Sequence, residues 1–262
     1  MRRVTLRIWR GERGDGEFED YTTECSPGMV VLDVVHRIQA EQASDLACRW
    51  NCKAGKCGSC SAEINGTPRL MCMTRMDSID TDKPVTVEPM QSFPHVRDLV
   101  TDVSSNYRAK MRITPFTPRE PDNPDGTWTM SQRDVDRVQE FRKCIECFLC
   151  QDVCHVLREH HLHDDFVGPR HFVYSAALDM HPLDTVDRTT ELRKEHGTGY
   201  CNITKCCTKV CPEHITITDN AIIPLKERVA DEFFDPLTRL FRIFKPRGRR
   251  GEPAQEGGTD GQ

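Results

Sequence analysis

The sequence predicts an α+β protein in two parts, a small unit of strands with one helix followed by a mainly helical unit. Apolar residues alternate at Val4, Leu6 and Ile8, which is the period of a half-buried strand. Four prolines between positions 114 and 126 predict an extended linker. We therefore expect the first unit at residues 1–105, the linker at 106–126, the helical unit at 127–245 and a disordered tail at 246–262.

Each expected element of the first unit has a local signal. Residues 18–24 are predicted to return as the hairpin partner of the first strand, and apolar residues at helical spacing over 31–38 predict an amphipathic helix. Asn65-Gly66 is a strong hairpin signal between strands at 61–64 and 67–72. Residues 85–87 are predicted to form the last strand of the sheet.

The second unit carries helix signals. Ser131 followed by Asp134 predicts a helix N-terminus, with a buried face over 135–141. Gly168-Pro169 predicts the start of another helix, because proline is favoured in the first turn. Residues 222–244 form a third stretch with helical periodicity.

Cysteine spacing indicates the chemistry of the chain. Twelve of its 14 cysteines fall into three short runs, counting Cys206 inside the third. The runs are Cys52-x4-Cys57-x2-Cys60 followed by Cys72, then Cys144-x2-Cys147-x2-Cys150-x3-Cys154, and finally Cys201-x5-Cys207-x3-Cys211-Pro212. The first has the spacing of plant-type [2Fe–2S] ligation, and the others have bacterial-type iron–sulfur spacing. The alternative, a structural zinc site, favours paired short spacings, which the first run lacks.

The first run predicts a [2Fe–2S] site with Cys52, Cys57, Cys60 and Cys72 as ligands. Gly55 and Gly58 would let the loop curl so that its amide N–H groups point at the sulfurs. Such hydrogen bonds raise the reduction potential of a cluster.

The other two runs predict sites that share ligands. In two-cluster bacterial ferredoxins the fourth cysteine of each run ligates the cluster of the other run. On that pattern a [4Fe–4S] cluster is assigned to Cys144, Cys147, Cys150 and Cys211. The remaining thiolates are those of Cys154, Cys201 and Cys207, and Thr204 stands where a fourth would be. Three thiolates suit a [3Fe–4S] cluster.

The remaining cysteines are interpreted as structural. Cys206 adjoins Cys207, and consecutive residues point in different directions, so we expect Cys206 to be a small buried apolar residue and not a ligand. Cys48 is expected to pack on a short helix at 44–48, and Cys25 to end a strand.

Two polar clusters allow two interpretations each. His160, His161 and His163 precede Asp164 and Asp165 and could form a metal site, although a solvated or partner-facing helix end is favoured. The basic run at 245–250 could touch anionic lipid, but a plain charged tail explains it as well.

Composition limits the classes of protein. Hydrophobic residues make up 37% and aromatic residues 7% of the chain, so we expect inorganic clusters to supplement a thin apolar core. The net charge of −5 gives no sign of nucleic-acid binding. No apolar run approaches the roughly 18 residues that span a bilayer. Arg2-Arg3 has no apolar stretch behind it, so we expect no export signal and a cytoplasmic location, where clustered cysteines bind metals.

The order of the three runs resembles the iron–sulfur subunit of the succinate dehydrogenase/fumarate reductase family, the succinate:quinone oxidoreductases. The likeness extends to about residue 235. Residues 93–100 resemble the segment that closes the ferredoxin domain of the family, and residues 166–169 its helix opener after the second run. The resemblance implies a plant-type ferredoxin domain of β-grasp fold, followed by a helical domain like bacterial ferredoxin.

The resemblance also implies the activity and partners. A flavoprotein subunit with FAD would oxidise succinate to fumarate, and electrons would pass from [2Fe–2S] to [4Fe–4S] to [3Fe–4S] and on to a quinone, menaquinone, at a membrane-anchor subunit. The chain has no Gly-rich dinucleotide fingerprint, so the flavin belongs to the partner. We expect a peripheral subunit held at the cytoplasmic face of the membrane, without succinate turnover of its own.

Three positions depart from the pattern of the family. His155 replaces the usual proline after the second run, residues 156–159 lack the tryptophan pair, and Asn202 replaces a common histidine. Our hypothesis is an unusual membrane partner, with quinone reached differently or through another redox centre. Arg158 and Glu159 would suit a polar protein interface better than an apolar quinone pocket.

Other functions remain open from the sequence. Fumarate reductase has the same architecture running in reverse, and cluster potentials, which vary widely with surroundings, decide the direction. An iron–sulfur subunit of a glycolate oxidase-like or heterodisulfide reductase-like complex is a further alternative, disfavoured by Thr204.

Overall fold

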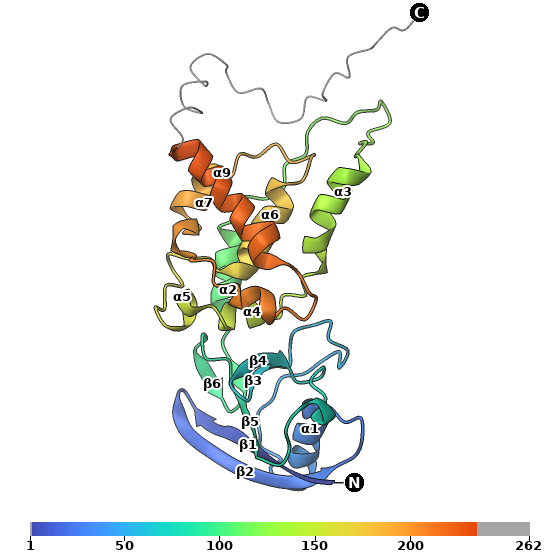
Figure 1. The fold of residues 1–262 in the computed structure, drawn as a ribbon, viewed down its shortest axis with the longest axis vertical. Helices are drawn as coiled ribbons and strands as arrows, with labels where there is room; N and C mark the ends of the chain where they lie inside the picture. Colours follow the sequence, from blue (N-terminus) through green and yellow to red (C-terminus); the bar gives the residue numbers. More distant parts are fainter. Residues whose placement is uncertain (1, 235–262) are drawn as a thin grey trace, which may run out of the picture.

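The computed structural model describes residues 2–234 as two stacked units, an N-terminal unit (residues 2–103) and a helical unit (residues 104–234) (Figure 1). Strands gather in the first unit and helices in the second, so the predicted α+β class is confirmed. The expected tail at 246–262, the basic run at 245–250 and the end of the 222–244 stretch lie outside the described residues.

The N-terminal unit is one mixed sheet with a helix against it. Its elements are β1 (Arg2–Glu12), β2 (Asp15–Cys25), α1 (Val31–Glu41), β3 (Ser61–Ile64), β4 (Thr67–Leu70), the 3-10 turn η1 (Met76–Ser78), β5 (Val85–Glu88), β6 (His95–Arg97) and β7 (Val100–Thr101). The strand order is β4-β3-β5-β1-β6-β7, with β2 paired to β1. The prediction that residues 85–87 form the last strand is wrong, because β6 and β7 follow.

The apolar periodicities place this sheet and helix as predicted. Val4, Leu6 and Ile8 of β1 are buried, and the apolar face of α1 packs into the same core. Asn65 and Gly66 both take left-handed φ values, 49° and 69°, and the chain reverses there between β3 and β4. The hairpin therefore forms where the two-residue signal predicted it.

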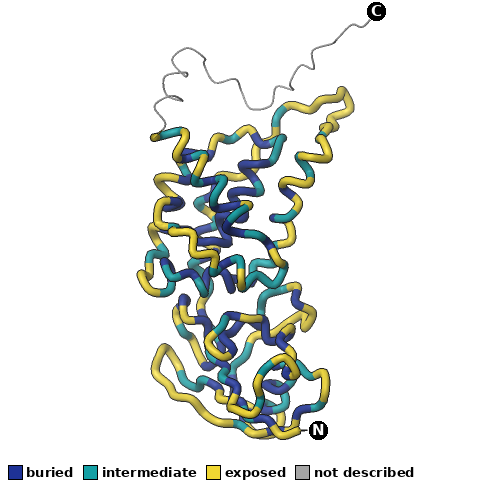
Figure 2. The backbone as a smooth tube through the Cα atoms, in the orientation of Figure 1, coloured by how far each residue is buried: buried dark blue, intermediate teal, exposed yellow. Residues whose placement is uncertain are grey.

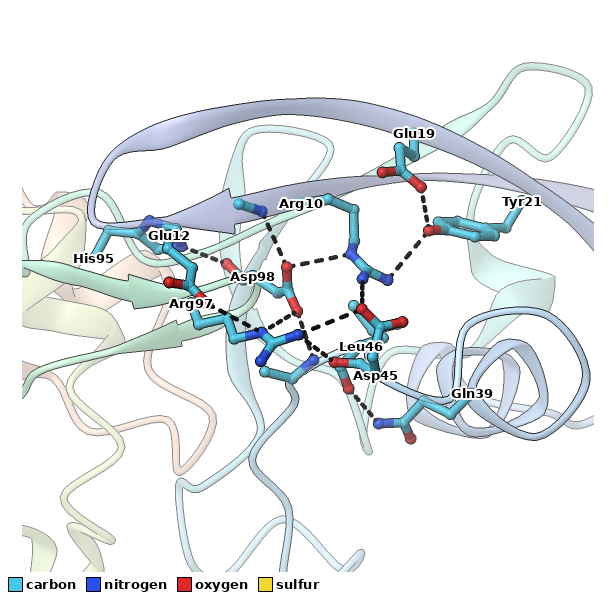
Figure 3. A network of polar contacts seen from close by, with 12 residues as sticks. Arg10, Glu12, Glu19, Tyr21, Gln39, Asp45, Leu46, His95, Arg97 and Asp98 are labelled. Atoms are coloured by element: carbon cyan, nitrogen blue, oxygen red, sulfur yellow. Dashed lines mark hydrogen bonds and ion pairs between the residues drawn. The ribbon is translucent and has the colours of Figure 1, made fainter.

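A buried carboxylate fixes the segment that leads into the first cysteine loop (Figure 3). Asp98 is 2% exposed and accepts hydrogen bonds from the backbone N–H of Gly11 at 3.0 Å and of Ala47 at 2.7 Å. Arg10 lies 3.2 Å from Asp98 and also pairs with Asp45 at 2.6 Å. A buried carboxylate needs such partners, so this network ties β1 to residues 42–50 and to the β6–β7 turn.

The predictions for Cys48 and Cys25, the two isolated cysteines, have different outcomes. The expected helix at 44–48 is wrong, because this stretch forms turns and Cys48 lies half-buried in an irregular segment. Cys25 ends β2 and is 1% exposed, as expected of a structural cysteine.

The helical unit is built from short helices around α6. Its helices are α2 (Ser104–Met111), α3 (Gln132–Gln139), α4 (Leu149–Asp152), α5 (His155–Arg158), α6 (Pro169–Asp179), α7 (Thr189–Lys194), α8 (Cys206–Lys209) and α9 (Ile223–Phe233). Its 3-10 turns are η2 (Glu140–Lys143) and η3 (Thr198–Tyr200), and a π-helical turn, η4 (Ile217–Ile222), runs into α9.

The core of this unit lies where α6 packs against η4, the turn that runs into α9 (Figure 2). Phe172, Ala176, Ile222 and Leu225 are fully buried there. The predicted helix starts are confirmed: Ser131 accepts a hydrogen bond from the Asp134 N–H before α3, and α6 begins at Pro169.

The expected linker is partly helical. Residues 106–111 belong to α2, whose Asn106 and Ala109 are buried, so the first part of the expected linker is a packed helix. Residues 114–121 have no helix and are bound to the chain after α6, with Pro118 bridged to Asp184, and residues 122–126 form a turn. Fully buried Arg188 donates a hydrogen bond to the carbonyl of Pro115 at 3.2 Å.

Candidate iron–sulfur sites

The first cysteine group lies at one end of the β3–β4 hairpin. Cys60 directly precedes β3, and the Met71 N–H donates to the Cys60 carbonyl at 3.1 Å, which brings Cys72 back beside Cys60. The Cys60 and Cys72 thiols interact, and the Cys57 thiol interacts with Cys52. The structure thus gathers the four residues predicted to hold a [2Fe–2S] cluster.

Backbone amides in this loop point at sulfur. The N–H groups of Ala54 and Lys56 each donate to Cys52 Sγ at 3.3 Å. Gly55 between them has a φ of +68°, a conformation that glycine adopts at little cost. Such contacts raise the reduction potential of a bound cluster.

The thiols of this group differ in acidity. Burial would raise the pKa of Cys57, but hydrogen bonds from Ser59 and Cys52 lower it to about 7. Burial raises the pKa of Cys60 to about 12. Because iron binds the thiolate, we expect a cluster to displace a proton from Cys60 as it assembles.

The second cysteine group surrounds a small apolar cavity. Cys144, Cys147 and Cys150 line it from the loop before α4 and from α4 itself, and Cys211 lines it from after α8. The Ile215 N–H donates to Cys211 Sγ at 3.4 Å. These are the four residues predicted to hold the [4Fe–4S] cluster, and their convergence fits that group.

The third cysteine group joins the end of the second run to the third run. Cys154 interacts with Cys207, and Cys207 in turn interacts with Cys201. Cys207 Sγ also lies 3.4 Å from the hydroxyl of Thr218 in the π-helical turn η4. The three thiols predicted for the [3Fe–4S] site therefore lie in one neighbourhood.

The loops of the second and third runs repeat one backbone shape. Glu146 and Phe148 have φ values of 55° and 63°, and their counterparts Ile203 and Lys205 both have 63°. A short helix begins directly after each, α4 after Phe148 and α8 after Lys205. In this repeat Thr204 occupies the position of Cys147, as the spacing predicted.

The same repeat places Cys206 opposite Leu149, a residue that packs into the apolar core of the N-terminal unit. Cys206 is half-buried, so the expectation of a small buried residue is met only in part. Its sulfur lies 3.2 Å from Thr204 Oγ1, and it also interacts with Cys154.

Two contacts of the sites had no signal in the sequence. Thr218 contacts Cys207 because of the π-helical turn, and such turns are frequent at functional sites. The Ser61 hydroxyl donates to the carbonyl of Cys147 at 2.9 Å and joins the first cysteine loop to the second. Both are contacts between residues that are distant or irregularly spaced, so spacing alone could not predict them.

The histidine cluster follows α5 at the surface. His160 and His161 are exposed, and His163 is half-buried against Phe93. Within residues 2–234, no group of three or more His, Cys, Asp or Glu side chains is placed to hold a single metal ion.

Arg158 and Glu159, the two charged residues expected at a partner interface, have different surroundings. Arg158 binds Glu63, which is 1% exposed and belongs to the N-terminal unit, while 29% of the Arg158 side-chain area stays accessible. A buried carboxylate without a cation is costly, which explains why Arg158 turns inward. Glu159 is exposed, with 66% of its side-chain area accessible.

None of the helices in the described part of the chain is both long and apolar enough to cross a membrane.

Two family models match the regions of the chain that contain the cysteine loops. Residues 5–108 match a family described as a 2Fe-2S iron-sulfur cluster binding domain. Residues 140–215 match a family described as a 4Fe-4S dicluster domain. The chain is therefore an iron–sulfur protein with two cluster-binding regions in series.

Relatives narrow this class. A fumarate reductase iron-sulfur subunit of Mycobacterium tuberculosis is 33% identical over 76% of this chain and 80% of its own length. A succinate dehydrogenase iron-sulfur subunit of Paracoccus denitrificans is 27% identical over 88% of this chain and 89% of its own. A solved structure, the Mycobacterium smegmatis Sdh1 complex in the apo form, contains a chain with 62% identity and a TM-score of 0.86, matched over 90% of this chain and 98% of that one.

The chain belongs to the family of succinate dehydrogenase and fumarate reductase iron–sulfur subunits. This confirms the family that the cysteine runs indicated, in preference to a glycolate oxidase-like, heterodisulfide reductase-like or zinc-stabilised protein.

Proposed function

We propose that the chain is the electron-transfer subunit of a membrane-bound succinate dehydrogenase. When bound, the clusters supply one-electron carriers between the FAD of a flavoprotein subunit and a quinone at a membrane-anchor subunit. The chain itself supplies ligands and spacing and no succinate turnover. Its two cluster-holding domains are proposed at 1–105 and 127–245, on either side of the proline-rich segment.

The residues proposed to hold the clusters form three sets. They are Cys52, Cys57, Cys60 and Cys72 for [2Fe–2S], then Cys144, Cys147, Cys150 and Cys211 for [4Fe–4S], and Cys154, Cys201 and Cys207 for [3Fe–4S]. The observation that carries the proposal is the repeated loop in which Thr204 stands for Cys147. A ferredoxin built for two four-iron clusters would have a thiolate at both positions, whereas a terminal three-iron carrier needs only one.

Succinate oxidation is the direction that the relatives favour. Identity to the chain of the Sdh1 complex is 62%, against 33% to the fumarate reductase subunit of M. tuberculosis. Fumarate reductase is the alternative, since that relative also covers most of the chain. By analogy with the complex, we propose a peripheral location at the cytoplasmic face of the membrane.

The residues of this chain nearest the quinone are proposed to differ from those usual in the family. His155 and Asn202 replace the residues usual in the family, and exposed Glu159 occupies the segment that commonly carries tryptophan. A charged side chain there favours contact with a polar partner surface over an apolar quinone pocket. We propose that quinone, with menaquinone as the first candidate, is reached through different contacts or through another redox centre of the membrane subunit.

Electron paramagnetic resonance of the anaerobically purified complex tests the proposal. We expect a three-iron signal in the oxidised sample that fades as succinate is added in steps, while a [2Fe–2S] signal grows. A complex with two four-iron clusters and no three-iron signal would contradict it. Succinate-driven reduction of menaquinone and of ubiquinone, compared with quinol-driven fumarate reduction, decides the direction and the quinone.

A further inference from the structure

The first and second cysteine loops touch backbone to backbone. A Cβ atom added to Gly58 would lie 2.5 Å from Cys147 Cα and 2.9 Å from Cys147 Cβ, distances that no side chain tolerates. Gly58 also has a φ of +70°, in the left-handed region. The residue directly after Cys57 must therefore be glycine for the two loops to meet.

A hydroxyl bridges the same contact. Ser61 Oγ donates to the Cys147 carbonyl at 2.9 Å and lies 2.8 Å from the Gly58 carbonyl, so its one hydrogen is shared between the two loops. Ser61 is 6% exposed and directly follows Cys60. Bonds thus run from one proposed ligand, Cys60, through Ser61 and one hydrogen bond to another proposed ligand, Cys147.

The space beside this contact is open. A cavity borders the contact, and its wall includes Gly58 and Ser61 together with Cys57, Cys147 and Tyr107. Electron tunnelling falls off more steeply across empty or water-filled space than along bonds. The bonded route through Ser61 and the packed route at Gly58 therefore couple the two loops better than the route across the cavity.

We propose that Ser61 and Gly58 form the electronic junction between the first and second cluster sites. The inference rests on the proposed relay function and adds the residues that connect its first two carriers. One electron leaves the carrier held by Cys60 and one arrives at the carrier held by Cys147. Ser61 keeps its proton, and no covalent bond forms or breaks. Ser61 acts as a positioning residue, because it touches ligand residues and not substrate.

The interface between the two units has other polar contacts, so the junction can be tested without separating the units. Lys56 pairs with Glu213 at 2.7 Å. Ser92 Oγ donates to the Asp152 carbonyl at 2.7 Å, and Ser92 is 4% exposed. Ser92 therefore makes the same kind of hydrogen bond across the same interface, but to a residue that is not a proposed ligand. Ser92→Ala is a matched control for Ser61→Ala.

The test uses the whole complex with clusters bound. A flash-generated one-electron reductant reduces the [2Fe–2S] site, and freeze-quenched paramagnetic resonance follows the decay of its signal and the rise of the [4Fe–4S] signal. Redox titration of each variant measures both potentials. We expect Ser61→Ala to slow the transfer several-fold with potentials unchanged, Ser92→Ala to leave the rate as in the wild type, and Gly58→Ala to slow transfer and weaken the magnetic interaction between the two reduced clusters.

The results separate the inference from the function on which it rests. Equal rates in Ser61→Ala and the wild type, with both clusters present, overturn the junction and leave the relay intact. Loss of a cluster in Ser61→Ala also overturns it, since the hydroxyl would then serve assembly. A wild-type complex whose clusters accept no electrons from succinate contradicts the proposed function, whatever the flash experiment gives.

Discussion

The loops at 144–150 and 201–207 have the same backbone but different surroundings. The loop at 144–150 is inserted between the units, with Cys147, Phe148 and Leu149 in the apolar core of the N-terminal unit. In the loop at 201–207 the counterparts Thr204 and Lys205 are exposed. The comparison teaches that the chain fixes the shape of a cluster loop independently of the number of thiolates in it, and that a single side chain then sets that number.

The largest expected effect is from restoring the missing thiolate. Thr204→Cys makes the loop at 201–207 chemically equal to the loop at 144–150, so we expect a four-iron cluster to replace the three-iron cluster. Paramagnetic resonance of the oxidised complex should then lose the three-iron signal completely. A full three-iron signal in Thr204→Cys would break the equivalence of the two loops.

Phe148 and Lys205 hold equivalent left-handed positions in the two loops, and replacing each with glycine tests how differently the two loops are buried. Phe148→Gly removes a buried ring at a cost of about 3–5 kcal/mol. It also relieves about 1–2 kcal/mol of left-handed strain and adds about 0.5–1 kcal/mol of chain entropy, so the net loss should be about 2–4 kcal/mol. Lys205→Gly relieves about 1–2 kcal/mol of left-handed strain but adds about 0.5–1 kcal/mol of chain entropy, so stability should stay within about 1 kcal/mol of the wild type. Thermal unfolding of the two variants measures the difference.

The control for Lys205→Gly is Asp219→Ala, because Lys205 pairs with Asp219 at 2.7 Å on the surface. If both glycine variants lose the same stability, the two loops do not differ in burial as described.

The carboxylate of Glu191, which precedes the loop at 201–207, is expected to make the stability of the fold depend on pH. Burial would raise the pKa of Glu191, but hydrogen bonds from His196 and Thr114 lower it to about 2. A lowered folded pKa contributes stability that is fully present above the unfolded value of 4.5 and is lost as pH falls toward 2. Glu191→Gln should therefore lower the thermal midpoint by the same amount at every pH from 8 to about 5.

Circular dichroism melts at a series of pH values check this expectation. The wild type and Glu191→Gln should converge as pH falls from about 4.5, where the unfolded chain takes up its proton at Glu191, toward about 2, where the folded chain does. A gap that widens as pH falls would have the wrong sign for a carboxylate with a lowered pKa.

The smallest expected effect is that of Cys206→Ser. Because Cys206 corresponds to Leu149, which lies in an apolar core and not in a ligand position, the three-iron signal should stay intact. The spectrum of the oxidised complex measures this. Disappearance of the signal would show that the thiol near Cys154 is a ligand.

Local signals in the sequence were sufficient for much of the fold. The Asn65-Gly66 turn, the Ser131 cap and the Pro169 start each depend on a few adjacent residues, and all three formed as predicted. The cysteine groups were also predictable, because most members of each set are close neighbours in sequence.

The rest depends on contacts that spacing does not record. β6 and β7 are three and two residues long, too short for a period to show. Residues 44–48 form turns, and Ala47 there donates to Asp98, which is distant in sequence. Arg158 pairs with Glu63, a carboxylate that is 1% exposed and lies far away in the sequence. In each case a tertiary partner decided the conformation.

The cavity lined by Cys144, Cys147, Cys150 and Cys211 also has a consequence for biosynthesis. Its donor set spans the chain from position 144 to position 211, so it is complete only after the last of these residues has left the ribosome. The first loop is complete once Cys72 has emerged. The N-terminal site can therefore receive its cluster while the helical unit is still being translated, whereas the second site cannot.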